Sequence, residues 1–466
     1  MSTHEPVDNL HTRAIAGFVS GLRFEDIPEE VRRRCKLLML DSIGCALYGA
    51  NLPWTRILQD SLAKIDRDGA AAVWGTGLRL SAPHAVLVNG AQVQGFELDD
   101  VHRHGVLHVG AVTLPALIAA TEMTGLTGRE FLTAAVAGYE IGPRVGICMG
   151  QEHIGQGWHS GATVGVFSAA AGAARGFRLA PEQTVHALGI AGTQAAGLMA
   201  AQFGAMVKRV HAGRSAQSGF YGALFARDGL TGIVDVFEAP YGGFCTTFSR
   251  STDRFDLAAL TAGLGSSWET MRISLKFYSC VGSNHTTLDA IRDLQRETPF
   301  TLDELKRIVV RGSQVTVDHV GWSYRPEGLT SAQLNLPFCV ATLLLEGDVF
   351  VDQFPPECVD DSDRIALSRK VEVVHDPAIT ALGSRFRHKV HVEIHLKDGR
   401  VLTETREAPQ GSEFSFAPDK VIVDKFRKMA AKALPRNRID ALVDAVLGLE
   451  DLADARELPR LMSFGE

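Results

Sequence analysis

The stretch from Glu97 to His108 holds three carboxylates and three imidazoles. Ionisable groups at this density cannot be buried without partners, and carboxylates beside imidazoles are suited to moving protons near neutral pH. The stretch runs directly into an apolar segment, residues 112–120, with helix-like character. We therefore interpret it as part of a functional site. Its carboxylates and imidazoles are Glu97, Asp99, Asp100, His102, His104 and His108.

Three other stretches carry candidate catalytic or binding side chains. They are the Gly157-Trp158-His159 motif, the segment from Met206 to Arg214 with Lys208 and His211, and the segment from Leu275 to Cys280 with Lys276, followed by His285. A lone lysine or histidine is more often solvated or structural than catalytic. Lys208, however, directly follows an uncharged run, residues 187–207, which we expect to be a buried helix. A lysine at such a position can reach into a cavity.

Two kinds of chemistry suit these side chains. His102, His104 and His108 with the neighbouring Asp pair could bind a metal ion, but their spacing matches no common metal motif. Alternatively, lysines and an arginine bind the carboxylates of a small substrate, and a neutral histidine removes the proton α to one of them. Loss of hydroxide, loss of carbon dioxide or reprotonation would give a dehydratase, a decarboxylase or an epimerase. No nucleotide-binding glycine motif or Gly-x-Ser-x-Gly elbow supports other chemistry.

Length and composition limit the class of protein. The 466 residues, 45% hydrophobic and 22% charged, indicate two or three globular domains. The net charge of −7 disfavours a nucleic-acid partner. The seven scattered cysteines include no Cys-x-x-Cys pair, which is typical of reduced thiols and offers no cysteine cluster for an iron–sulfur centre. Without a secretory signal at the N-terminus, we expect a cytoplasmic protein that does not span a membrane.

Hydrophobic periodicity predicts a mainly α fold. From Thr12 to about Gly265 the spacing is helical, and many contact positions are Ala or Gly, so the helices should pack closely. Residues 306–317 alternate like a strand, and residues 387–407 predict a hairpin with its turn at Asp398-Gly399. The helical tail, residues 419–449, should pack back on the first domain. We predict a helical domain (1–268), an α+β lid (269–413) and a returning helical segment (414–466).

A series of short motifs runs nearly end to end along the chain: Leu40–Gly44, Asn89-Gly90, Asp99-Asp100, His108–Ala111, Gly138-Tyr139-Glu140, Gly157-Trp158-His159, Lys208–Gly213, Ala216–Gly219, Leu230-Thr231-Gly232, Lys276–Cys280 and Ser331–Phe338. In their order and spacing these motifs resemble the MmgE/PrpD family, which includes 2-methylcitrate dehydratase, cis-aconitate decarboxylase and iminodisuccinate epimerase. The resemblance implies a large helical domain, a smaller α+β lid with a cleft between them, no metal or organic cofactor, and commonly a homodimer.

The resemblance also implies roles for individual residues. His108 and His159 resemble the proton-transfer pair, and Lys208 and Lys276 resemble the carboxylate-binding groups, with Asp99 or Asp100 orienting an imidazole or the lysine. Arg103, an addition to the usual loop pattern, either meets an extra carboxylate of the substrate or faces solvent. Further substrate-binding residues are expected at Asp100, His102, His104, His211, Arg214 and Phe338.

Departures from the family pattern bear on the reaction. Val101 and Phe338 stand where decarboxylase members present a threonine and a tyrosine, and a lost substrate-binding hydroxyl costs about 1 to 3 kcal/mol. His108-Val109-Gly110-Ala111 replaces the His-Pro-Ser-Asp of dehydratase members. We expect a cofactor-independent lyase of the hydro-lyase type, acting on a small di- or tricarboxylate. The alternatives are an epimerase, a decarboxylase at the same site, or a non-catalytic metabolite-binding protein.

Overall fold

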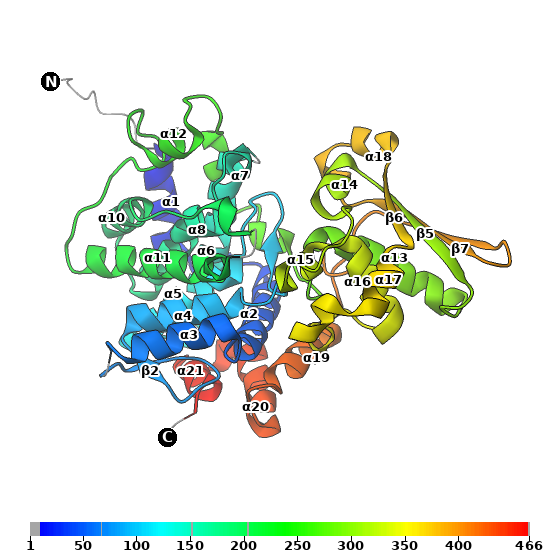
Figure 1. Ribbon diagram of the computed structural model, residues 1–466. Helices are drawn as coiled ribbons and strands as arrows, with labels where there is room; N and C mark the ends of the chain where they lie inside the picture. The colour runs from blue at the N-terminus through cyan, green and yellow to red at the C-terminus, as the bar shows by residue number, and fades with distance from the viewer. Residues whose placement is uncertain (1–9, 67, 151, 203–204, 465–466) are drawn as a thin grey trace.

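The computed structural model describes residues 10–66, 68–150, 152–202 and 205–464. Figure 1 shows a larger helical lobe beside a smaller lobe that contains a sheet. The predicted fold class, mainly α with a smaller α+β part, is confirmed, whereas the domain boundaries stay predictions. The extreme N-terminus, on which the expected cytoplasmic location rests, lies outside the described residues. Among the described helices, none is long and apolar enough to span a membrane.

The large lobe is built around α9, which packs against α5, α6, α10 and α11. Small residues bring these helices close together, as predicted. A Cβ at Gly90 of α4 would lie only 2.6 Å from the Cα of Gly213 in α11. The helices of this lobe are α1 Leu10–Gly21, α2 Glu29–Gly49, α3 Pro53–Ala63, α4 Ala82–Val93, α5 Val109–Thr124, α6 Gly128–Met149, α7 Glu152–Gly155, α8 Ser160–Thr163, α9 Gly165–Gly176, α10 Pro181–Gly192, α11 His211–Arg227 and α12 Phe244–Ser249.

The uncharged run 187–207 is not the single buried helix that we predicted. Helix α10 ends at Gly192, and Leu198 is 61% exposed. The chain instead turns back on the His159 motif, where the His159 N–H donates to the Gly197 carbonyl at 3.1 Å. Glycine is a poor helix former, and the glycines at 192 and 197 favour this turn over a continued helix. Short 3-10 turns follow at Met199–Gln202 and Met206–Val210, and the second carries Lys208.

The small lobe holds a four-stranded mixed sheet in the order β6-β5-β7-β8. β5 runs parallel to β6 and antiparallel to β7. The predicted hairpin is present, and the residues of β7 alternate between buried and partly exposed. β5 ends before the predicted position because the Ser313 side chain accepts from the Thr316 N–H and begins a helix. The strands are β5 Leu305–Gly312, β6 Val371–His375, β7 Val390–Leu396 and β8 Val401–Arg406.

Helices flank this sheet, and further helices return to the large lobe. The helices of the small lobe are α13 Gly282–Glu297, α14 Gln314–Val320, α15 Leu329–Leu334, α16 Leu336–Glu346, α17 Ser362–Ser368 and α18 Pro377–Ala381. After the hairpin come α19 Asp419–Ala430, α20 Arg436–Leu447 and α21 Glu457–Met462. Helix α19 packs against α2, where Lys425 Nζ lies 2.6 Å from the Asp41 carboxylate. The same ammonium donates to the Leu98 carbonyl at 2.8 Å, so the C-terminal segment supports the stretch that starts at Glu97.

Candidate active site

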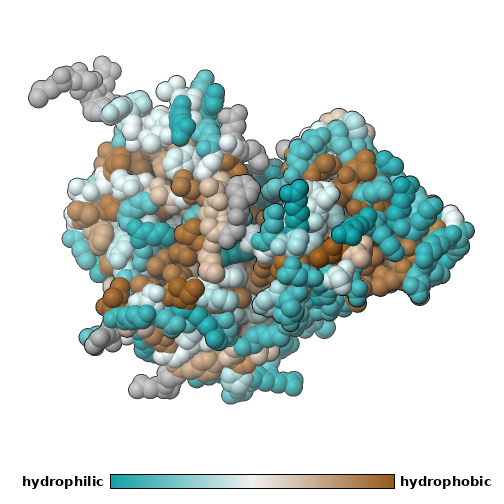
Figure 2. All heavy atoms as spheres, in the orientation of Figure 1, coloured by the Kyte–Doolittle hydropathy of each residue, from teal (hydrophilic) through white to brown (hydrophobic). Residues whose placement is uncertain are grey.

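A cavity of about 1220 Å³ lies between the two lobes and is lined by residues from both. Figure 2 shows the notch between the lobes at the top of the view. Typical small-molecule pockets enclose about 300 to 1,000 Å³. The cavity is therefore roomy for a small carboxylate, and a bound substrate would leave space for water unless the lobes move closer together.

A short antiparallel ladder brings two of the predicted motifs together. β3 (Val101–His102) pairs with β4 (Ile273–Ser274), and Val101 lies opposite Ser274. The acid–histidine loop, residues 97–108, therefore runs alongside the segment that leads to Lys276. Four of the five residues predicted as catalytic line the cavity, namely His108, His159, Lys208 and Lys276, and the fifth, Asp99, lies directly behind His108.

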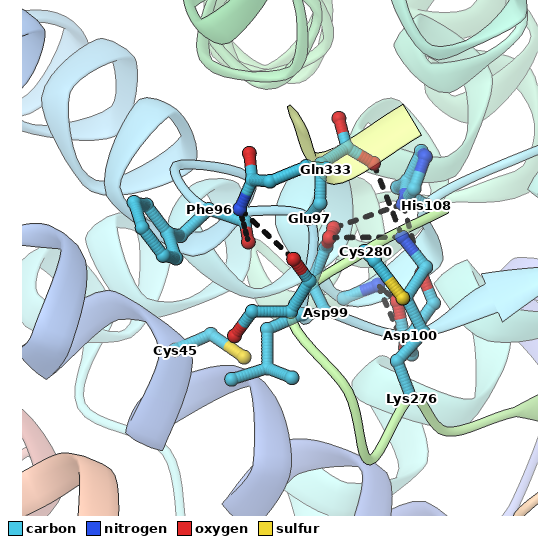
Figure 3. Close-up of polar contacts among 12 residues, drawn as sticks. Cys45, Phe96, Glu97, Asp99, Asp100, His108, Lys276, Cys280 and Gln333 are labelled. Carbon is cyan, nitrogen blue, oxygen red and sulfur yellow. Dashed lines mark hydrogen bonds and ion pairs between the residues drawn. The ribbon is translucent and has the colours of Figure 1, made fainter. Parts of the chain in front are cut away.

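Glu97 lies at the centre of a buried cluster of cations. Its carboxylate contacts the Lys208 ammonium at short range and Arg209 Nη1 at 2.7 Å. The same carboxylate lies 3.4 Å from Lys276 Nζ, and Figure 3 labels Glu97 and Lys276. The Glu97 backbone is left-handed, with φ of 58°, a conformation that costs free energy in residues other than glycine. Such strain persists where surrounding contacts fix it, which is common at functional sites. The ion pairs of this carboxylate supply those contacts.

The charges of this cluster shift one another's pKa values. Burial alone would raise the pKa of Glu97, but Lys208, Lys276 and Arg209 outweigh it and hold the pKa well below its usual range. Burial lowers the pKa of Lys208 more strongly than Glu97 raises it. For Lys276 burial is also unfavourable, yet Glu97 and Asp99 together raise its pKa. Lys276 is therefore a firmly charged ammonium at the cavity wall.

His108 is oriented by the loop that carries it. Its Nδ1 donates to the Asp100 carbonyl at 3.0 Å and lies 3.0 Å from the Asp99 carboxylate (Figure 3). Because both contacts involve Nδ1, the other ring nitrogen, Nε2, is left for the cavity. The Asp99 oxygens make no hydrogen bond with any described residue, so their partners are the ionic groups His108 and Lys276. These contacts fix the orientation of the His108 ring.

His159 differs from His108 in its surroundings. Burial, the nearby His211 ring and the charge of Lys208 hold the pKa of His159 well below its usual range. The His159 and His211 ring centroids are 4.9 Å apart, and among the described residues neither ring has a carboxylate contact like that of His108 with Asp99. Of the two predicted proton-transfer histidines, His108 is thus backed by a carboxylate and His159 stays neutral. Two histidines in such different surroundings can carry different roles in proton transfer.

Several residues predicted to bind substrate lie outside the cavity lining, and their contacts explain why. Both Asp100 oxygens accept from the Gly110 N–H, at 3.0 and 3.1 Å, at the start of α5. A Cβ at Gly110 would overlap the Ser42 hydroxyl, so α5 approaches α2 closely there. His102 is fully buried between Glu269, 3.0 Å from its Nε2, and the Gly105 N–H. Both residues shape the acid–histidine loop from within.

The remaining predicted binding residues also point elsewhere. His104 is exposed, and Arg214 is exposed on α11, where it hydrogen-bonds Gln217. His211 lies beside His159 but not on the cavity wall. Phe338 is fully buried and packs against Tyr324, with ring centroids 4.3 Å apart. Its missing hydroxyl therefore leaves the cavity unchanged, which removes one of the two sequence differences that argued against decarboxylation.

The metal hypothesis finds no support in the loop geometry. His102, His104 and His108 are respectively buried against Glu269, exposed, and turned to the cavity. Over the described ranges, no group of three or more His, Cys, Asp or Glu side chains is arranged to hold a metal ion.

Sequence reasoning missed the central role of Glu97 and nearly all of the small-lobe wall. Glu97 belonged to the recognised loop, and its position beside Phe96 gave no sign of three cationic partners. Of the residues on the small-lobe side, sequence reasoning had noted His285 and the segment that begins at Ser331. The small-lobe wall of the cavity includes Ser283, His285, His319, Arg387 and His388, and Arg103 of the acid–histidine loop also lines the cavity. No motif links these residues in the sequence, so only the fold could bring them together.

The fold and this cavity define a class: two-lobed, mainly helical proteins with a cleft of lysines and histidines suited to small carboxylates. Residues 13–256 match the MmgE/PrpD N-terminal domain and residues 278–449 match the MmgE/PrpD C-terminal domain, so the chain belongs to the MmgE/PrpD family.

Similar proteins span the whole chain. A cis-aconitate decarboxylase-like protein of Aspergillus oryzae is 37% identical and a cis-aconitate decarboxylase of Aspergillus terreus is 33% identical. These alignments cover 97% of this chain and 97% and 96% of the relatives. The human cis-aconitate decarboxylase is 25% identical over 97% of this chain and 94% of its own length.

Proposed function

We propose that this protein is a carboxy-lyase that decarboxylates cis-aconitate. The main support is the 33 to 37% identity, over essentially the full length, to proteins named cis-aconitate decarboxylase or decarboxylase-like. This proposal replaces the hydro-lyase that the sequence first favoured. The burial of Phe338 away from the cavity removes part of the argument for that earlier preference.

The proposed reaction breaks one carbon–carbon bond and moves one double bond. The bond from the CH₂ carbon to its carboxylate breaks, and carbon dioxide leaves. The released electron pair forms a new terminal double bond, and the displaced pair of the old double bond takes up a proton at the CH carbon. One tricarboxylate and one proton thus give one five-carbon unsaturated dicarboxylate and one carbon dioxide.

The cavity residues suit this reaction. Negative charge develops next to a retained carboxylate, and the ammonium groups of Lys208 and Lys276 stabilise it there. His108 delivers the proton from Nε2, while Asp99 behind Nδ1 stabilises the imidazolium before transfer. His159, held neutral, hydrogen-bonds a substrate carboxylate without adding charge, which avoids stabilising the carboxylate that must leave as a neutral molecule.

The test measures carbon dioxide and the organic product in one reaction with purified protein and cis-aconitate. We expect one carbon dioxide for each cis-aconitate consumed, with a five-carbon dicarboxylate as the product. Consumption without carbon dioxide, giving a hydrated tricarboxylate, would indicate the hydro-lyase instead. No consumption at millimolar substrate would contradict the proposal.

A further inference from the structure

One buried amide of the small lobe contacts the three segments that carry the Glu97 cluster, which consists of Glu97, Lys208, Arg209 and Lys276. Gln333 lies on α15 and is fully buried, and it is not among the described residues that line the cavity. Its Nε2 donates to the Ser279 carbonyl at 3.0 Å and to the Phe96 carbonyl at 3.4 Å (Figure 3). Its Oε1 accepts from Arg209 Nη2 at 3.5 Å. The side chain thus uses both of its donor hydrogens and its acceptor.

Two of these contacts fix the position of the Glu97 carboxylate. The Phe96 carbonyl belongs to the peptide group that joins Phe96 to Glu97, whose backbone is left-handed with φ of 58°. Such a conformation persists only where surrounding contacts hold it, and the Gln333 amide holds this peptide group from the small-lobe side. Arg209 contacts the Glu97 carboxylate at 2.7 Å and follows Lys208 directly in the chain. Gln333 therefore supports Glu97 both through its peptide group and through its guanidinium partner.

The third contact reaches the segment that carries Lys276. Ser279 lies three residues beyond Lys276, and its carbonyl accepts the shortest of the Gln333 side-chain hydrogen bonds. A buried carbonyl or guanidinium that loses its partner costs free energy unless the chain moves to find another. Removal of the Gln333 amide therefore favours movement of the segments that position Lys276 and the Glu97 carboxylate.

The backbone of Gln333 is anchored in the small lobe. Its carbonyl accepts from the Val281 N–H at 3.2 Å, just before α13, and from Asn284 Nδ2 at 3.5 Å. Three of its neighbours on α15 line the cavity, namely Thr330, Ser331 and Leu334. The helix that carries Gln333 is therefore part of the small-lobe wall, and it contacts the Glu97 cluster through the Gln333 side chain.

We propose that Gln333 is a positioning residue of the active site. Its amide holds the segments that carry Glu97, Lys208 and Lys276 in the arrangement that binds substrate carboxylates, and it ties that arrangement to the small-lobe wall. Gln333 acts through the Glu97 cluster and not by contact with substrate. A displacement of about 1 Å in such groups can lower a rate by about 10²-fold. This inference rests on the proposed function for its reactive substrate, but its effect on ligand binding can be measured separately.

The test compares Gln333→Met with Gln92→Met in the full-length protein. Both substitutions replace a fully buried glutamine, but Gln92 lies on α4 and donates to the Trp74 carbonyl at 3.1 Å. Calorimetry with the unreactive ligand propane-1,2,3-tricarboxylate separates two effects, because a loss of folded protein lowers the stoichiometry and a displaced site lowers the affinity. We expect Gln333→Met to weaken binding by about 10-fold, as expected for one charged hydrogen-bonded contact. Gln92→Met should keep the wild-type affinity even where both variants unfold at a lower temperature.

Kinetics with cis-aconitate give a second readout. Gln333→Met should lower kcat by about 10²-fold, whereas Gln92→Met should keep kcat near the wild-type value. Gln333→Asn guards against loss of folding, because it keeps an amide that is one methylene too short to reach all three segments. Its affinity and kcat should lie between those of the wild type and of Gln333→Met, and they remain measurable if Gln333→Met does not fold.

Wild-type affinity and kcat in the Gln333 variants would overturn the positioning role. An equal loss of affinity in Gln92→Met would also overturn it, because any buried glutamine would then have the same effect. If cis-aconitate is not decarboxylated but tricarboxylate binding depends on Gln333, the positioning role stands and the proposed reaction fails. A wild type that neither binds the tricarboxylate nor consumes cis-aconitate would overturn both.

Discussion

The two walls of the cavity balance their charges in different ways. On the wall of the large lobe, Lys208, Arg209 and Lys276 converge on one carboxylate, Glu97. On the opposite wall, Arg103 contacts Glu413, while Arg387 and His388 of the small lobe have pKa values lowered by burial and by neighbouring charge. The shared carboxylate of Glu97 holds the three cations of the first wall in place before substrate arrives, and these cations outnumber the carboxylates of Glu97 and Asp99. The opposite wall instead lines the cavity with arginine, serine and histidine side chains.

The arrangement of the first wall matches what catalysis needs. Electrostatic stabilisation of a transition state works best from groups that need no reorganisation. The Glu97 cluster meets this condition, since each cation is already held by a shared carboxylate.

Among the large-lobe residues that line the cavity, substitution of His108 should have the largest effect on kcat. His108→Gln removes the proposed proton donor and should lower kcat by about 10²- to 10⁴-fold, with little change in thermal unfolding. His104→Gln is the matched control, because His104 belongs to the same loop but is exposed outside the cavity. Steady-state kinetics of both variants test the difference. Equal activity in the two would remove His108 from the proposed mechanism.

Glu97 should affect both activity and stability. Glu97→Gln leaves three buried cations without their carboxylate and should lower the free energy of unfolding by about 3 to 5 kcal/mol, with a large loss of kcat. Denaturant unfolding measures the first effect. A variant as stable as the wild type would contradict the view that Glu97 holds this wall together.

The pH dependence of the free energy of unfolding provides a second test of the role of Glu97. The pKa of Glu97 is lowered in the folded protein. Its stabilisation is therefore present above the unfolded pKa of about 4.3 and is lost as pH falls from there through the folded pKa. Unfolding measured across this acid range should show a smaller loss of stability for Glu97→Gln than for the wild type. Parallel pH profiles would argue against an ionised Glu97.

Removing the contacts that α19 makes with the acid–histidine loop should have a smaller effect on stability and kcat. Lys425→Met removes the buried partner of Asp41 and the donor to the Leu98 carbonyl. We expect a loss of stability of about 3 kcal/mol and a lower kcat. Asp41→Leu combined with Lys425→Met removes both charges and should recover much of the stability but not kcat, because the Leu98 contact stays lost. Full recovery of kcat would show that α19 does not position the acid–histidine loop.

The smallest effects are expected at Val101 and Phe338, the two positions where the sequence lacks a hydroxyl that decarboxylase members present. Val101 lines the cavity, whereas Phe338 is buried against Tyr324. Val101→Thr should therefore change kcat/KM for cis-aconitate. Phe338→Tyr should leave kcat/KM near the wild-type value and cost about 1 to 3 kcal/mol of stability, because the added hydroxyl lacks a ready partner. The reverse pattern would place Phe338 in the substrate contacts after all.

Much of the fold could be predicted because its signals are local. The alternation of apolar residues and the Asp398-Gly399 turn predict the β7–β8 hairpin. Glycines such as Gly90 indicate the close packing of the helices. For residues 187–207 the predicted single helix was wrong. The absence of charge does not indicate where a chain reverses direction, and this reversal depends on the contact of Gly197 with His159.

The site was only partly predictable for a related reason. The acid–histidine loop was visible as a cluster, but the sequence did not show which of its side chains face the cavity. His102 is buried against Glu269 and the Gly105 N–H, whereas His108 lines the cavity, and this difference depends on contacts outside the local sequence. Ser283 lies in α13, whereas Arg387 and His388 precede β7, so no local pattern could reveal that all three line the same cavity as Arg103.

The most direct measurement of the central claim is proton NMR of the protein in deuterated water with cis-aconitate, 2-methylcitrate and iminodisuccinate together. We predict that cis-aconitate alone is consumed and that its five-carbon product carries one carbon-bound deuterium, at the position protonated in the cavity. Dehydration of 2-methylcitrate or epimerisation of iminodisuccinate, with cis-aconitate untouched, would contradict the proposed decarboxylation.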